Sequence, residues 1–196
     1  MTIEDIKFLD TYFDDFKRLI NFNDDEIKKK ISNLKKIVVS TKKNGKKILI
    51  FGNGGSAAIA SHFSVDLTKN AKIRCTNYNE ADLITCFSND FGYEHWVEMA
   101  IKYFGDKGDV LIVISSSGKS KNMINACIEA RKKKFSKIIT LTGHSVNNPI
   151  RKLGDINLWV NTKAYNYIEN IHQFWLLSLV DLVIGKTNYL PNVQLM

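Results

Sequence analysis

Apolar residues near the N-terminus recur at spacings of three and four, and this pattern predicts two amphipathic helices. The stripes consist of Ile6, Leu9, Phe13, Phe16 and Ile20 in the first helix and Ile27, Ile31, Leu34 and Val38 in the second. Between them, Asn23 followed three positions later by Glu26 resembles a capping box. Residues 1–45 thus form a helical pair without a core of its own. We expect this pair to pack on the main body or, preferably, on a neighbouring subunit.

After this pair, short apolar runs alternate with helical patterns. The runs that predict buried strands are 47–52, 81–87, 109–115, 137–143 and 156–160. The stretches that predict helices are 55–69, 93–104, 119–133 and 164–184, the last of which Gly185 is placed to end. Strands that alternate with helices predict an α/β fold, here a parallel five-stranded sheet flanked by helices. With only two prolines and no linker, residues 1–196 form one domain.

Composition narrows the class of protein. Hydrophobic residues make up 44% and charged residues 24% of the 196 positions, which is typical of a globular chain. No apolar run approaches the roughly 20 residues of a membrane span, and the acidic start MTIEDIKFLD is unlike a signal peptide. Cys75, Cys86 and Cys127 are scattered, as expected of buried thiols in a reducing compartment. We therefore expect a cytoplasmic protein that does not contact membranes.

The net charge of +8 permits contact with anionic partners. The lysines gather on the polar faces or ends of predicted helices, as in Lys28 to Lys30 and Lys132 to Lys134. Aromatic residues do not interleave with these lysines, as a nucleic-acid stacking platform would require. Solvated helix faces explain the charge better, and a nucleic-acid partner is not favoured.

Two polar loops follow predicted strands, at the sheet edge where ligands bind in parallel α/β folds. The first, residues 52–58, reads GNGGSAA, and its glycines let the backbone approach a ligand closely. The second, residues 115–120, reads SSSGKS, and its hydroxyls at a helix start suit a phosphate group, with Lys119 and Lys121 adding positive charge. Such turns can also be plain helix caps, so the pair of loops is the stronger indication.

Two nucleotide-binding motifs are incomplete here. A Walker A loop needs a glycine five residues before Gly118, where Val113 stands. The fingerprint Gly52-x-Gly54-x-x-Ala57 lacks the acidic residue expected about 20 positions later, because that region reads KIRCTN. We expect no nucleotide cofactor.

The segments FGNGGSAA, SNDFGYE and ISSSGKS resemble the sugar isomerase (SIS) domain family, and within it the phosphoheptose isomerases. The resemblance covers nearly the whole chain. It implies an aldose–ketose isomerase that converts sedoheptulose 7-phosphate to D-glycero-D-manno-heptose 7-phosphate for surface polysaccharide. It also implies a homotetramer with active sites between subunits, and often a zinc ion.

The resemblance assigns roles by position. Its sugar-contacting residues become Asn53, Gly54, Gly55 and Ser56, with the pair Asn89 and Asp90. Its phosphate cup becomes Ser115, Ser116, Ser117 and Ser120. The helix after the glycines carries His62 and Asp66, and the last helix carries Glu169 and His172.

Three positions depart from the family pattern. Asp66 replaces a glutamate, Glu169 replaces a glutamine, and Leu177 replaces a histidine that is both a metal ligand and a catalytic acid–base in the family. These departures put the usual zinc site and proton donor in doubt. They leave two alternatives open. One is a non-catalytic relative, either a sugar-phosphate-binding module or a protein adaptor. The other is an isomerase or epimerase that acts on another phosphosugar.

The chemistry of these side chains fits isomerisation. His62 and Asp66 share one helix face at spacing i,i+4, and Glu169 and His172 share another at i,i+3. A carboxylate such as Asp66 or Glu169 can take the proton beside a carbonyl, and a histidine can act as acid. His62, Asp66 and Glu169 could instead hold a metal that polarises the carbonyl.

The same residues also have purely structural interpretations. His62 can be a structural histidine, Asp66 a solvated helix residue, and Glu169 with His172 a surface pair. Two further histidines, His95 and His144, have no evident partner in the sequence, and Trp159 and Trp175 suit a core or an interface. The functional interpretation therefore requires the glycine and serine loops to be neighbours.

Overall fold

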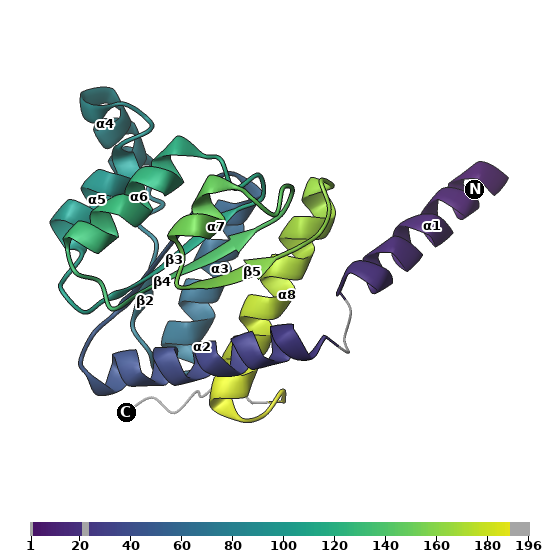
Figure 1. The fold of residues 1–196 in the computed structure, drawn as a ribbon, viewed down its shortest axis with the longest axis horizontal. Coiled ribbons are helices and arrows are strands. Elements are labelled where there is room, and N and C mark those ends of the chain that lie inside the picture. The colour runs from purple at the N-terminus through teal and green to yellow at the C-terminus, as the bar shows by residue number, and fades with distance from the viewer. Residues whose placement is uncertain (1, 21–23, 189–196) are drawn as a thin grey trace.

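The computed structural model describes residues 2–20 and 24–188, and these contain one sheet of five parallel strands. The strands are β1 (Ile48–Gly52), β2 (Cys75–Thr76), β3 (Val110–Ser115), β4 (Lys137–Thr142) and β5 (Ile156–Trp159), in the spatial order β2-β1-β3-β4-β5. Figure 1 shows helices on both sides of this sheet. The predicted α/β fold with a parallel five-stranded sheet is confirmed.

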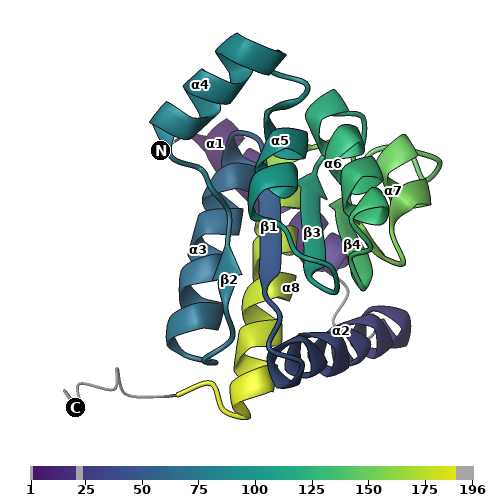
Figure 2. The same cartoon turned by 90° about the vertical axis from the view of Figure 1, so that its left-hand side faces the viewer.

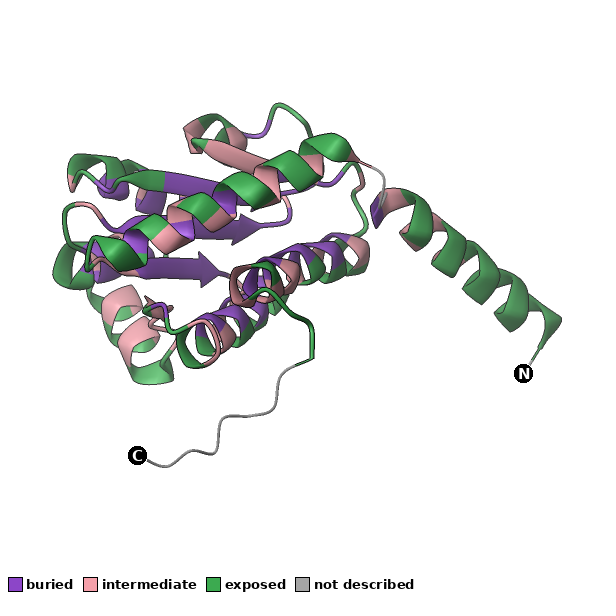
Figure 3. Cartoon of the chain, turned by 90° about the horizontal axis from the view of Figure 1, so that it is seen from below, coloured by how far each residue is buried: buried purple, intermediate pink, exposed green. Residues whose placement is uncertain are grey.

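Side chains of alternating strand residues explain the two layers of helices. Ile48 and Ile50 point into a core with α2 (Asp25–Lys43), α3 (Gly55–Lys69) and α8 (Tyr165–Ile184). Leu49 and Phe51 point into the opposite core with α5 (Trp96–Phe104), α6 (Lys121–Lys132) and α7 (Pro149–Leu153). Because both faces are covered, the central strands read as continuous apolar runs, and Figure 3 shows them buried along their length.

One predicted element is wrong. Residues 81–87 were expected to form a strand, but they begin the helix α4 (Ala81–Phe91). Leu83, Ile84 and Phe87 lie at helical spacing and pack, partly buried, against the core to which α5 also contributes. A short apolar run of this length cannot be assigned from periodicity alone. The remaining strand is β2, which has only two residues and runs beside α3 in Figure 2.

The N-terminal helices are bound to the body to different degrees. The side chain of Asp24 caps α2 by accepting hydrogen bonds from the amides of Glu26 and Ile27, whereas the predicted cap Asn23 lies outside the described residues. Leu34 and Val38 of α2 are buried in the core beside α8. Helix α1 (Ile3–Ile20) contacts the body near its C-terminal end and otherwise projects away from it (Figure 1).

Along α1, several apolar side chains are exposed. The exposed fractions are 74% for Ile3, 66% for Phe8 and 54% for Phe13. In the middle of α1, the Tyr167 hydroxyl of α8 donates to the carbonyl of Tyr12 at 3.1 Å. Among the described helices, none has the length and apolar character needed to cross a membrane.

Candidate active site

The glycine and serine loops are neighbours, as predicted. Strands β1 and β3 pair in parallel, with Gly52 opposite Ile114, so both loops leave the sheet at the same edge. Each loop contains a glycine with positive φ, +53° at Gly54 and +66° at Gly118. The loops therefore face one region at the carboxyl ends of the strands, where a parallel sheet binds its ligands.

The serine loop presents hydroxyls at the start of α6. The Ser115 and Ser120 hydroxyl oxygens are 3.2 Å apart, and Ser117 Oγ accepts from the amide of Lys119 at 3.3 Å. Ser116 is only 6% exposed, yet its hydroxyl has no hydrogen-bond partner among the described residues. A buried polar group without a partner is uncommon, and an ordered water or a ligand would supply the missing hydrogen bond. Together with the free amides of the helix N-terminus, the loop suits a phosphate.

Asn148 holds this loop in place from the next strand connection. Its side chain, which is almost fully buried, donates to Thr142 Oγ1 at 3.1 Å and to the Ser145 carbonyl at 2.9 Å. It also packs so closely on Gly118 that any larger residue there would overlap it. Nothing in the sequence singled out Asn148, because this role depends on a contact between two loops.

Asn53 of the glycine loop is held by two residues that no sequence motif identifies as part of the site, Asn122 and Tyr93. Its side-chain oxygen lies 2.9 Å from Asn122 Nδ2 and 3.1 Å from the Tyr93 hydroxyl. Tyr93 belongs to the segment SNDFGYE, and Asn122 lies two residues after Ser120, so both were near predicted site residues. Ser56, predicted to bind substrate, is buried beneath Gly52.

The carboxyl group of Glu169 lies against the glycine loop. It comes from the first turns of α8 and packs on Gly55, where any side chain would overlap it. Burial raises the pKa of Glu169, and within the described part of the chain the carboxylate has no hydrogen bond or ion pair that offsets this effect. A carboxylate with a raised pKa and no partner is suited to general acid–base chemistry.

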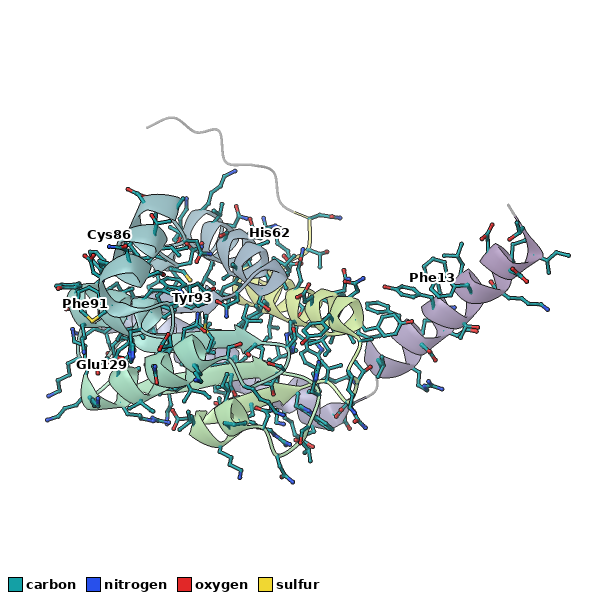
Figure 4. The ribbon with its side chains drawn as sticks, turned by 90° about the horizontal axis from the view of Figure 1, so that it is seen from above. Phe13, His62, Cys86, Phe91, Tyr93 and Glu129 are labelled. Atoms are coloured by element: carbon teal, nitrogen blue, oxygen red, sulfur yellow. The ribbon has the colours of Figure 1, made fainter. Side chains whose placement is uncertain are left out.

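His62 and Asp66 pair with each other along α3. His62 Nε2 lies 3.4 Å from Asp66 Oδ2, and its Nδ1 lies 3.4 Å from Gln173 Nε2 on α8. Asp66 Oδ1 accepts a hydrogen bond from Asn70 at 3.3 Å. His62, labelled in Figure 4, is exposed on the α3 side of the helix pair. Gln173 was not predicted, although it follows the predicted residue His172 directly.

His172 is fully buried below the site. Its Nε2 lies 3.2 Å from the carbonyl oxygen of Thr142, and since a carbonyl only accepts, Nε2 carries the proton. Burial lowers the pKa of His172 to about 4 despite this hydrogen bond. The imidazole is therefore neutral near pH 7, and its position supports the end of β4 rather than contact with a ligand.

Asn89 and Asp90 lie in the last turn of α4. Asn89 Nδ2 donates to Asp90 Oδ1 at 2.9 Å, and the Cys86 thiol lies 3.8 Å from Asp90 Oδ2. Across Ala81–Phe91, all of which the structure describes, no residue is buried. This helix thus carries the two residues at the surface, one short connection away from Tyr93.

Comparison with known proteins agrees with this arrangement. The sequence pattern of the SIS domain matches residues 11–143. The phosphoheptose isomerase of Buchnera aphidicola is 36% identical over 179 residues, which cover 87% of this chain and 90% of the relative. That of Glaesserella parasuis is 39% identical over 156 residues, 76% of this chain and 80% of the relative. The chain belongs to the phosphoheptose isomerase family of SIS domains.

Solved structures of this family share the fold. A phosphoheptose isomerase from Francisella tularensis superposes with a TM-score of 0.84 at 27% identity, covering 95% of this chain and 100% of that one. The phosphoheptose isomerase GmhA from Neisseria gonorrhoeae gives a TM-score of 0.83 at 26% identity, covering 90% and 98%. The similarity spans each pair of chains almost completely, so the folds correspond over nearly their whole length.

The zinc ion that resemblance to phosphoheptose isomerases implies does not fit the donors described here. No three His, Cys, Asp or Glu side chains of the described residues lie close enough to share a metal. His62 and Asp66 pair, but Glu169 packs on Gly55, and Leu177 lines an apolar hollow with Phe16. The ligand set His62, Asp66 and Glu169 stays a prediction, and no step below uses a metal.

Proposed function

We propose that this chain isomerises sedoheptulose 7-phosphate to D-glycero-D-manno-heptose 7-phosphate. The observation that carries the proposal is the unpartnered Glu169 carboxyl, which lies against the glycine loop at the sheet edge that also holds the serine loop. The names of the relatives support the choice of substrate. A phosphosugar held by the serine loop would extend toward the glycine loop and this carboxylate.

Binding would use both loops. The hydroxyls of Ser115, Ser116, Ser117 and Ser120 and the N-terminus of α6 would hold the phosphate, with the buried Ser116 hydroxyl gaining the partner it lacks. Asn53 and the exposed backbone of Gly54 and Gly55 would contact the sugar, and Asn89 and Asp90 would bind its hydroxyls from α4. Ser56 is buried to the same degree as Ser115 and Ser116, and we keep it as a substrate contact from the start of α3.

Proton transfer would begin at Glu169. Its carboxylate takes the proton from C1 of the ketose, the C1–H electrons form the C1=C2 bond of an enediolate, and the ketone π electrons move onto O2. Return of the proton to C2, with transfer of the O1 proton to O2, gives the aldose. Asp66 is the second candidate base, but it is already paired with His62 and Asn70. His172 would position the Thr142 carbonyl rather than donate a proton.

The experiment is incubation with sedoheptulose 7-phosphate in heavy water, followed by NMR for aldose formation and for deuterium at C1 or C2. We expect both in the wild-type chain, and a loss of roughly 100- to 10,000-fold in Glu169→Gln. Glu4→Gln, on the exposed start of α1, is the matched control and should retain full activity. Binding of the sugar phosphate without turnover would instead support a non-catalytic binding module.

We also propose a cytoplasmic homotetramer. The exposed apolar residues of α1 support association between copies, and so does the hollow of about 850 Å³ that Phe174, Leu177 and Leu182 line on α8. The number of subunits rests on the resemblance to the family. The free thiols of Cys75, Cys86 and Cys127 support a reducing compartment.

A further inference from the structure

Two asparagines face each other where the sugar loop meets the phosphate loop. Asn122 Nδ2 lies 2.9 Å from Asn53 Oδ1, and Asn53 Nδ2 lies 3.1 Å from Asn122 Oδ1. Asn122, at the start of α6, is only 2% exposed. The Tyr93 hydroxyl completes the group at 3.1 Å from Asn53 Oδ1. This cluster joins the glycine loop, the helix behind the serine loop and the connection that follows α4.

The orientation of both amides follows from a backbone group. The amide of Met123 lies 3.1 Å from Asn122 Oδ1, and it shares its hydrogen with the Ser120 carbonyl, also at 3.1 Å. Because a backbone N–H only donates, the atom of Asn122 beside it is the oxygen. Asn122 Nδ2 then points to Asn53, so the atom of Asn53 that accepts its hydrogen bond is also an oxygen.

This orientation fixes what Asn53 can offer to a ligand. Its oxygen has two lone pairs, and these accept from Asn122 and from Tyr93. One of its two N–H groups donates to Asn122. The group that remains is a single N–H, so toward a ligand the Asn53 side chain is a donor only.

We propose that this N–H donates to the ketose oxygen O2, which gains negative charge in the enediolate, and that Asn122 and Tyr93 are positioning residues. The inference rests on the proposed function. A ketone oxygen has lone pairs and no hydrogen, so it matches a group that can only donate. A donor held in place before the reaction stabilises the developing charge without reorganisation. The two hydrogen bonds at Asn53 Oδ1 polarise the amide and strengthen its remaining N–H.

Tyr93→Phe tests the hydroxyl with the least disturbance, because Tyr93 is half-exposed and the ring is kept. We expect kcat to fall about tenfold while KM changes less than about twofold, since the lost interaction acts on the transition state. Tyr103→Phe is the matched control: this exposed tyrosine of α5 makes ring contacts with Phe87 and Phe104. It should keep both constants within about twofold of the wild type.

Asn122→Asp tests the orientation itself. The carboxylate accepts but cannot donate, so Asn53 Oδ1 loses the hydrogen bond from residue 122 and faces a second oxygen instead. This repulsion removes the arrangement that holds the remaining N–H of Asn53 toward the ligand. We expect kcat to fall about 100-fold or more, as for the loss of an oxyanion donor. A merely structural link between the loops would instead lower stability and leave kcat of the folded fraction unchanged. Unchanged kcat in both Tyr93→Phe and Asn122→Asp would overturn the inference.

A binding measurement separates this inference from the proposed function. Calorimetry would compare inorganic phosphate with a phosphorylated aldonohydroxamate, which mimics the enediolate. We expect Asn122→Asp to weaken hydroxamate binding at least about tenfold and phosphate binding less than about twofold. Equal hydroxamate affinity in both chains would overturn the inference and leave the function standing. A wild-type chain that binds neither probe would overturn both.

Discussion

Glu169 illustrates how one residue gains chemistry from its surroundings. An exposed glutamate is an ordinary charge, whereas Glu169 lies against Gly55 with its pKa raised by burial. In the folded chain, the Glu169 carboxyl therefore keeps its proton to a higher pH than an ordinary glutamate does, because its pKa is raised. The base form is lost as the pH falls through this raised pKa.

The activity should follow this titration. We expect kcat/KM to rise with pH along a limb whose midpoint lies above 4.5, the ordinary pKa of a glutamate. A pH–rate profile of the wild-type chain measures this midpoint. Asp66→Asn, which leaves Glu169 in place, should keep the limb at the same pH. Its disappearance in that variant would identify Asp66 as the base instead.

His172 makes the stability of the fold depend on pH. Burial lowers its pKa from 6.5 to about 4, so the unfolded chain binds the proton more tightly than the folded chain. Its stabilising contribution is complete above pH 6.5 and is lost as the pH falls from there toward 4. Between about pH 7 and pH 5, we expect this residue to lower the free energy of unfolding by about 2 kcal/mol.

Urea unfolding at these two pH values measures the effect. His172→Gln should lose less stability across the interval, because glutamine does not titrate. His95→Gln is the control, since His95 is half-exposed beside Glu98 and should keep the wild-type loss. Equal losses in all three chains would show that His172 does not govern this range.

At the scale of elements, α3 and α8 run side by side in the same direction. Gly55 meets Glu169 near the start of both helices, and His62 meets Gln173 further along. One more turn on each helix brings Asp66 to the level of Leu177. Position 177 therefore decides whether this helix pair carries a third metal donor.

Leu177→His should create a zinc site with His62 and Asp66. We expect the variant to bind about one zinc ion per chain, and the wild-type chain to bind none tightly, because two donors are too few. Metal analysis after dialysis and calorimetric titration measure this directly. Leu182→His, on the exposed face of α8 further along, is the control and should bind no more zinc than the wild type. Stoichiometric zinc in the wild-type chain would contradict the prediction.

At the scale of the whole molecule, α1 leaves apolar surface in water unless another copy covers it. We expect Phe13→Asp, at an exposed apolar position of α1, to lower the assembly state seen by light scattering. Stability of the monomer should change little, because Phe13 is exposed. Lys7→Asp, also exposed on α1, is the control for the change in charge. A wild-type chain that is monomeric at micromolar concentration would contradict this assembly.

The pattern of apolar residues along the chain predicted the strands that are buried at every position. Residues 47–52 and 109–115 were recognised as strands because both of their faces are covered, so they are apolar throughout. Residues 81–87 were misassigned because the apolar positions of α4 fit either period over so short a run. The two residues of β2 carry no pattern at all.

The sequence by itself determined the layered fold and the two loops at strand ends, because local periodicity and glycine and serine content depend only on neighbours along the chain. Only the tertiary structure decided that Glu169 lies on Gly55, that His172 is buried, and that Asn122 and Tyr93 hold Asn53. These facts depend on contacts between residues far apart in the sequence. Burial and hydrogen bonding at such contacts set pKa and orientation, and a linear pattern does not contain them.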